Sequence, residues 1–260
     1  MICFASIVSS SPLLIPTINQ ENILQIQETI HALEKIAILA AETDPETLII
    51  ISLNDENSEN MFSINLSEEY LADFKNFGDL ITKMKFKSDA ELIYKIKERF
   101  ENLSSPLSTI ITTEPNLSIN NSVPLYYLKQ KIQKFSLIPI NCSSADQKTH
   151  LLFGQNLKEE ISSSNKRVAI IACHKLLLKK EASDNKNIEE SLINLIKKKN
   201  IAKLIKQDVY DLRPILVFLG IIHNLKSKPK ILSWQKLSDF GYLTINFDLN
   251  FKKQKFIKVA

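Results

Sequence analysis

Three groups of polar residues follow three apolar runs in this sequence, and they hold the side chains best suited to chemistry. The groups are Ser9-Ser10-Ser11 after CFASIV, Leu53-Asn54-Asp55-Glu56 after TLIIIS, and His174-Lys175 after RVAIIAC. His174 with Asp55 or Glu56 would make a general acid–base pair or part of a weak metal site. Ser10 as a nucleophile would need a base and an oxyanion hole, and the sequence identifies neither.

The same residue types also favour ordinary loops. Serine, asparagine and aspartate bond to nearby backbone groups and so occur often in turns. A catalytic metal usually has three protein ligands, and this pattern offers two at an unknown distance. The residues alone therefore favour solvated loops. The side chains kept as candidates for a cleft are Ser10, Asn54, Asp55, Glu56, His174 and Lys175.

Composition limits the class of protein. The chain has 260 residues, of which 44% are hydrophobic and 24% charged, as in a soluble globular protein that needs neither disulfide nor structural metal. Its net charge of +4 is small and dispersed, so no nucleic-acid partner is expected. Clusters such as IKKKN and FKKQKFIK are interpreted as solvated faces.

Cysteine usage and apolar runs predict the compartment. Cys3, Cys142 and Cys173 are odd in number, lie at no ligand spacing and sit in or beside β-branched runs, which indicates a reducing environment. The start of the chain lacks the basic region of a secretory signal, and no run reaches the roughly 18 apolar residues of a membrane span. We expect a cytoplasmic protein without membrane contact.

The elements that must position the candidates alternate along the chain. ICFASIV reads as a buried strand, residues 21–41 as an amphipathic helix and TLIIIS as a second strand. MFSINLSEEYLADF is interpreted as a hairpin, and further strands and helices follow to the end. The sequence predicts one α/β domain over residues 1–260, with a central, mostly parallel or mixed sheet and helices on both faces.

Glycine is scarce, with four in the whole chain. The sequence therefore has no GxGxxG motif, no Walker loop and no nucleophile elbow, each of which needs glycine at a sharp turn or near phosphate. In an open α/β sheet, ligands bind beyond the carboxyl ends of parallel strands. If the three apolar runs are parallel neighbours, the three polar groups meet there.

The order of segments resembles the LigB-like family of class III extradiol ring-cleavage dioxygenases, which includes the MEMO-like proteins. The resemblance covers nearly the full length and rests on collinear order. The matching stretches are ASIVSSSPLLIP, TLIIISLNDE, FSINLSEEYLADFKNFGD, VPLYYL, KTHLLFGQNLKEEISSSNKRVAIIAC, LRPILVFLG and GYLTINF. By resemblance, active members hold ferrous iron with two histidines and a carboxylate, leaving positions for a catecholic substrate and dioxygen.

At the ligand positions this chain departs from the pattern that the resemblance implies. Ser10 stands at the first histidine and Asn54 at the second. Ser118-Ile119-Asn120 replaces Asp-His-Gly, Leu178 falls at the histidine thought to act as base, and His174 occupies a usual glycine. The acidic ligand falls on or near Val209, with Asp208 or Asp211 as substitutes if the register shifts.

Serine and asparagine are weak neutral ligands for ferrous iron. The first hypothesis is therefore a pseudoenzyme of this family, with no cofactor, that acts as a binding or assembly protein through a homo-oligomer, a protein partner or a small-molecule ligand. The alternative is an oxidoreductase or dioxygenase-class enzyme on aromatic or other small substrates, with a site rebuilt from Asp55, Glu56, His174 and Lys175. Whether the chain is an enzyme stays open at this point.

Overall fold

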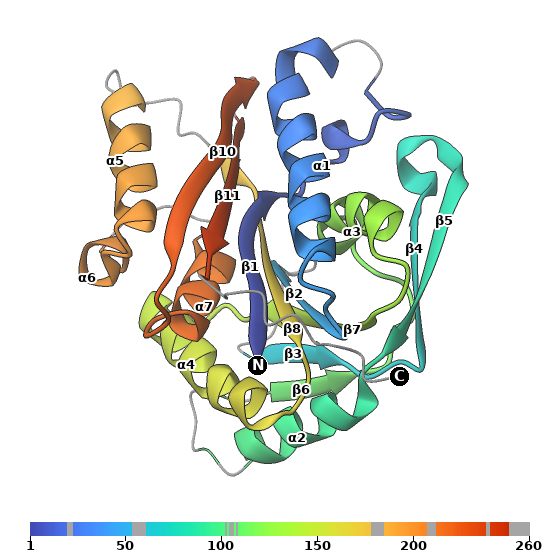
Figure 1. Ribbon diagram of the computed structural model, residues 1–260, viewed down its shortest axis with the longest axis vertical. Helices are drawn as coiled ribbons and strands as arrows, with labels where there is room; N and C mark the ends of the chain where they lie inside the picture. Colours follow the sequence, from blue (N-terminus) through green and yellow to red (C-terminus); the bar gives the residue numbers. More distant parts are fainter. Residues whose placement is uncertain are drawn as a thin grey trace, which may run out of the picture.

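The computed structural model describes residues 1–19, 23–53, 61–101, 103, 107, 109–177, 185–206, 212–237 and 240–249. These residues form one 11-stranded mixed sheet with helices on both faces (Figure 1), as the sequence predicted. The strands are β1 (Ile2–Ser9), β2 (Thr47–Leu53), β3 (Phe62–Asn65), β4 (Glu69–Phe74), β5 (Asp79–Ser88), β6 (Thr109–Thr112), β7 (Ser136–Cys142), β8 (Val168–His174), β9 (Leu176–Leu177), β10 (Lys228–Leu237) and β11 (Phe240–Asp248).

The centre of the sheet is parallel. Its main order is β10-β11-β1-β8-β2-β7-β3-β6, in which β1, β8, β2 and β7 run in the same direction. β11 and β3 flank this group in the antiparallel direction. The three strands that precede the candidate residues, β1, β8 and β2, are thus parallel neighbours. Buried β-branched runs such as TLIIIS suit strands that are covered on both faces.

Helices cover the two faces unequally. On one face lie α1 (Gln27–Ala41) and α3 (Ile119–Lys131). On the other lie α2 (Ala90–Glu101), α4 (Gln147–Ser163), α5 (Asn185–Lys197), α6 (Ile201–Leu204) and α7 (Arg213–Ile221). Strand residues alternate between the two cores, as Ile49 and Ile50 do on β2, because successive strand side chains point to opposite faces.

Short 3-10 turns complete the fold. They are η1 (Pro12–Leu14), which Ser11 caps, η2 (Ile23–Ile26), which precedes α1, and η3 (Lys75–Phe77), which turns β4 into β5. Gly78 follows η3 with φ +89°, a conformation that glycine adopts without steric cost. Among the described residues, no helix has the length and apolar composition needed to cross a bilayer.

The predicted hairpin over MFSINLSEEYLADF is wrong. Its two halves are β3 and β4, which do not pair: β3 pairs with β6 and β7, whereas β4 pairs with β5. β4 and β5 project from the sheet as an arm (Figure 1). β5 was not predicted from the sequence, because lysine, which is uncommon in strands, alternates there with Thr82, Met84 and Phe86.

Two of the four glycines join α4 to α7. A Cβ atom on Gly154 would lie 2.0 Å from the Val217 carbonyl oxygen, and one on Gly220 would lie 2.3 Å from the Leu151 carbonyl oxygen. Real Cβ atoms do not approach backbone oxygens so closely, so only glycine allows the two helix backbones to touch. These two glycines thus serve close helix packing, and neither belongs to a phosphate-binding motif.

We predict that Gly154→Ala destabilises the protein. Alanine raises helix propensity by about 1 kcal/mol, but the overpacking against Val217 costs about 1–3 kcal/mol or more, and it meets rigid backbone. The midpoint of urea unfolding should fall accordingly. Asn156→Ala on the same helix is the control and should change the free energy of unfolding by less than about 0.5 kcal/mol. An unchanged or higher midpoint for Gly154→Ala would contradict the close helix contact.

Candidate functional site

The carboxyl ends of β1, β8 and β2 form a common rim. Ser9 at the end of β1 lies opposite His174 at the end of β8, and β8 pairs with β2 on its other side. The first turn of α3 reaches the same place with Asn120. The structure therefore brings the ends of the three apolar runs together, as the parallel-neighbour interpretation required. We call this region the strand-end rim.

Ser10 is enclosed at the strand-end rim. The residue is 1% exposed, and its hydroxyl lies 3.4 Å from Asn120 Oδ1 and 3.3 Å from the His174 carbonyl oxygen. Its backbone N–H donates to the same carbonyl at 3.2 Å. The buried Asn120 in turn donates from Nδ2 to the Leu53 carbonyl oxygen at 3.4 Å. Neutral groups of the protein thus satisfy one another where β1, β8, β2 and α3 meet.

The imidazole of His174 faces away from this contact. Cys173 belongs to the core under α1 and α3, so alternation places the next side chain on the opposite face. His174 Nε2 donates to the Leu243 carbonyl oxygen at 2.8 Å, and Nδ1 has no hydrogen-bond partner among the described residues. Burial lowers the pKa of His174 to about 4, so the ring is neutral near pH 7.

The other sequence candidates divide into two groups. Lys175 is half-buried directly after β8. Asn54, Asp55 and Glu56 lie outside the described residues, as do Leu178, Asp208, Val209 and Asp211. Ser10 and His174 meet through the His174 backbone carbonyl. Among the described residues, no carboxylate bonds to the His174 imidazole.

Two polar residues near the strand-end rim, Tyr242 and Asn121, were not singled out from the sequence. The Ser11 and Tyr242 hydroxyls lie 3.4 Å apart, which joins the rim to β11. Asn121, in the first turn of α3, is buried and its Oδ1 has no partner among the described residues. The available signal was the adjacent pair of asparagines at the start of a helix, where their side chains commonly cap backbone groups.

Side chains that could bind a metal do not gather within the described ranges. No group of three His, Cys, Asp or Glu side chains comes together there in a way that could hold an ion. Cys142 and Cys173 are buried, and desolvation raises the pKa of both thiols. Both cysteines therefore stay protonated near neutral pH, which removes them as thiolate ligands.

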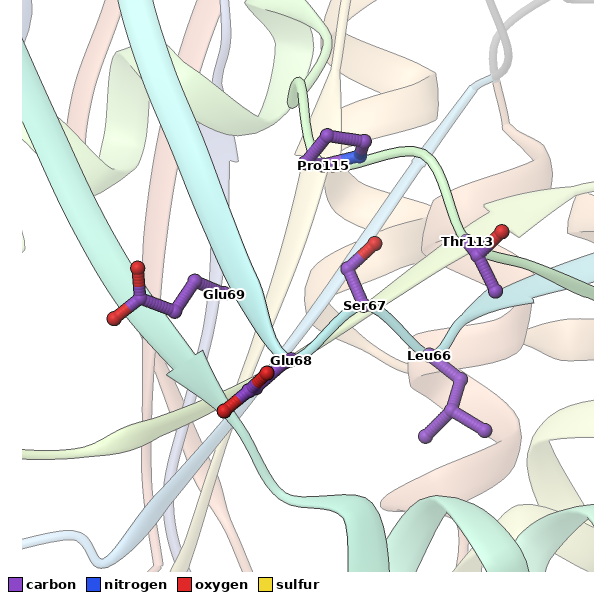
Figure 2. A pocket seen from close by; sticks show the side chains of 6 residues that line it. All are labelled: Leu66, Ser67, Glu68, Glu69, Thr113 and Pro115. Carbon is purple, nitrogen blue, oxygen red and sulfur yellow. The ribbon is translucent and has the colours of Figure 1, made fainter.

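A shallow depression lies elsewhere, between the β3–β4 and β6–α3 connections. Its walls are formed by Leu66, Ser67, Glu68, Glu69, Thr113 and Pro115. Figure 2 shows the carboxylates of Glu68 and Glu69 on one side and Leu66 and Thr113 on the other. Because β3 runs antiparallel to β7, this depression lies toward the amino ends of the parallel strands. It contains none of the candidate residues.

The structure has the architecture of an open α/β protein, a class in which ligands generally bind beyond the carboxyl ends of the parallel strands. Within that class, residues 5–233 match the family model described as the catalytic LigB subunit of aromatic ring-opening dioxygenase. This match covers most of the chain, so the chain belongs to the LigB family. The resemblance noted in the sequence is confirmed at the level of the family.

Two further proteins are similar to this chain. Protein CA_C1420 of Clostridium acetobutylicum is 24% identical over 253 residues, which cover 89% of this chain and 54% of that protein. The chain thus spans about half the length of this relative. The crystal structure of the uncharacterized protein JW3007 from Escherichia coli K12 matches with a TM-score of 0.65 at 11% identity, covering 94% of this chain and 99% of the other. The second likeness shows the shared fold.

We predict that stability falls as the pH drops below about 6.5, partly through His174. Its pKa is near 6.5 in the unfolded chain and about 4 in the folded protein, so the unfolded state binds the proton first. The contribution is complete above pH 6.5 and is lost as the pH falls toward 4, at no more than about 1.4 kcal/mol per pH unit.

Urea unfolding of wild type and His174→Gln at several pH values between 7 and about 4 measures this loss. Glutamine keeps a donor for the Leu243 carbonyl but cannot titrate, so the variant should show a shallower slope. Burial also lowers the pKa of His150, so part of the slope should remain. His31→Gln, on the exposed side of α1, is the matched histidine-to-glutamine control. Equal slopes for wild type and His174→Gln would contradict the assignment.

Proposed function

We propose that this chain is a LigB-family protein that holds no iron at its strand-end rim and acts as a binding or assembly protein without ring-cleaving chemistry. The observation that carries the proposal is the contact of Ser10 with Asn120 at the ends of β1 and β2. In ring-opening members, by resemblance, this is where histidine supplies the first ligand. Here a hydroxyl and an amide face each other instead.

The donor set does not fit ferrous iron. Hydroxyl and amide oxygens are weak neutral ligands, and a 2-His-1-carboxylate site depends on imidazole nitrogen and on carboxylate charge. Ser10 and Asn120 are also buried and contact each other and the backbone carbonyls of His174 and Leu53. A cation would have to disrupt these contacts and would gain poor ligands in return.

His174 is a poor substitute ligand despite its neutral imidazole. Its ring lies on the face of β8 opposite Asn120 and is held by the Leu243 carbonyl. Bringing a ring nitrogen to Ser10 would break this bond and reverse the side-chain alternation at the end of β8. The geometry of the described residues supports loss of the iron site over its reconstruction around His174.

Two observations support a role in binding or assembly. The strand-end rim keeps polar groups at the place where open α/β sheets bind ligands, and these groups are uncharged hydrogen-bonding groups. In addition, the relative from C. acetobutylicum contains a matching region and roughly as much additional chain. A region of this kind can therefore work joined to another part, which supports assembly with a protein partner in this chain.

We predict that protein purified anaerobically with ample iron contains far less than one iron per chain. Elemental analysis measures the content, and oxygen uptake with catechols should equal the rate without protein. A variant with Ser10→His, Asn54→His and Val209→Glu restores the ligand types that the resemblance implies, and it should retain more iron than wild type.

Ser10→His alone is the matched control, because one imidazole should not hold the ion. Circular dichroism and thermal melting check that each variant folds. About one iron per chain in the wild-type protein, or catechol-dependent oxygen uptake that a chelator abolishes, would overturn the proposal. Failure of the triple variant to fold would leave the wild-type iron measurement as the deciding result.

A further inference from the structure

The closed end of the β4–β5 arm exposes three large apolar side chains that are close in the sequence. Phe77 is 41% exposed, Leu80 71% and Ile81 92%. We call these three residues the arm tip. Single apolar residues are common on protein surfaces, but a group of exposed apolar side chains at one place often marks a contact site. Figure 1 shows the arm along one margin of the molecule.

Hydrogen bonds fix the backbone of the arm tip. The ladder between β4 and β5 shifts register at its closed end, so residues 80–82 bulge out of it. The Asp79 carboxylate holds this bulge, because its Oδ1 accepts from the backbone N–H groups of Ile81 and Thr82 at 3.0 and 2.9 Å. Its Oδ2 accepts from the Thr17 hydroxyl at 2.6 Å, which ties the bulge to the segment before α1. The outward position of the arm tip is therefore built into the fold.

Lysines follow the arm tip along the outward face of β5. Lys83, Lys85 and Lys87 are exposed alternate residues and share this face. Met84 and Phe86, which lie between them, pack into the core on the other side of the arm. Alternate strand residues are about 6.4–6.8 Å apart, so the three ammonium groups form a row that leads away from the arm tip.

Exposed cations predominate on the arm. Of its carboxylates, Asp79 is only 7% exposed, and the other two form ion pairs with lysine: Asp73 with Lys75 at 3.4 Å, and Glu69 with Lys85 at 3.7 Å. In each pair the lysine side chain is the more exposed partner, at 57% against 28% and 71% against 48%. The surface that a large partner meets around the arm tip is therefore positively charged.

We propose that the arm tip enters the surface of an anionic lipid bilayer, with the lysines of β5 at the level of the lipid phosphates. Binding at a membrane surface combines apolar side chains, which enter the boundary between headgroups and acyl chains, with lysines that attract anionic headgroups. The arm has both features in this order along one strand. The inference departs from the expectation of no membrane contact, which rested on the length of apolar runs. It does not depend on the absence of iron, because the arm contains none of the strand-end rim residues.

Lipid suits the arm tip better than a second copy of this chain does. A standard protein interface buries about 800 Å² on each partner. Three side chains cannot supply this area, since even an aromatic side chain contributes at most about 250 Å². A two-fold contact between arm tips would also bring the same lysines of both copies together, and like charges repel. A bilayer needs no matching shape, and its anionic headgroups complement the lysines.

Co-sedimentation of the full chain with phosphatidylcholine vesicles that contain roughly 30% phosphatidylserine tests the proposal. The wild type should bind these vesicles, and more weakly when the salt concentration rises or phosphatidylserine is left out. A variant with Leu80→Gln and Ile81→Gln should bind at least about 10-fold more weakly, because it loses the apolar area that enters the lipid. A variant with Lys83→Gln and Lys85→Gln should lose at least about 5-fold on the anionic vesicles only.

The matched control for the arm tip is a variant with Ile38→Gln and Leu152→Gln, the same residue types on α1 and α4, where they are 46% and 45% exposed. It should lose less than about twofold in vesicle affinity. Lys35→Gln with Lys148→Gln is the control for the lysines, because both are exposed and lie outside the arm. Thermal melting checks that each variant folds.

A second measurement reports on the arm tip directly. In an Ile81→Trp variant, vesicles should move the added tryptophan emission to shorter wavelength, as expected for an indole that enters lipid. Absence of wild-type binding to the anionic vesicles, or equal affinity of wild type and the Leu80→Gln, Ile81→Gln variant, would overturn the proposal. Sedimentation velocity without vesicles covers the other occupant: a wild-type dimer that this variant converts to monomer, with no vesicle binding, would overturn the proposal in favour of a second copy.

Discussion

The contact between α4 and α7 is the constraint on which one side of the fold depends. Gly154 and Gly220 allow the two helix backbones to touch, which brings the helices close together on the same face of the sheet. Both helices begin near the carboxyl end of β7. Arg213, the first residue of α7, donates to the Ser143 carbonyl just after β7 at 2.6 Å, and His150 in α4 is held by the Asp146 carbonyl at 2.8 Å. The contact that the two glycines allow and the hydrogen bonds at the helix starts thus hold α4 and α7 together along this side of the sheet.

Much of the fold could be predicted because burial leaves a clear pattern in the sequence. Continuous β-branched runs such as TLIIIS become the central parallel strands, and the apolar periodicity before Ala41 becomes α1, which begins at Gln27. Pairing was harder to predict. β3 and β4 are close in sequence but pair with other strands, because the turn at Gly78 closes β4 onto β5 instead. The contact between α4 and α7 was also not predicted. Until the partner helix is known, a glycine within an apolar helix indicates only a lower helix propensity.

The candidate site was predictable in location but not in contacts. The rule for parallel strands places Ser10 and His174 at one edge, and the structure does so. Which face each side chain takes depends on its place in the alternation along its own strand, β1 for Ser10 and β8 for His174, and a shift of one residue would reverse it. That parity sets Ser10 against Asn120 and turns the His174 imidazole toward Leu243. The residues that follow β2 lie outside the described part, so their contribution rests on the resemblance alone.

The strand β10 closes the long path of the sheet, and its exposed edge has a consequence for solubility. An edge strand presents unpaired backbone groups that can recruit the strand of another molecule, and natural proteins counter this with lysine and proline. β10 carries Lys228, Pro229, Lys230 and Lys236 along its length. Repulsion between like charges on approaching copies therefore opposes edge-to-edge pairing at this strand.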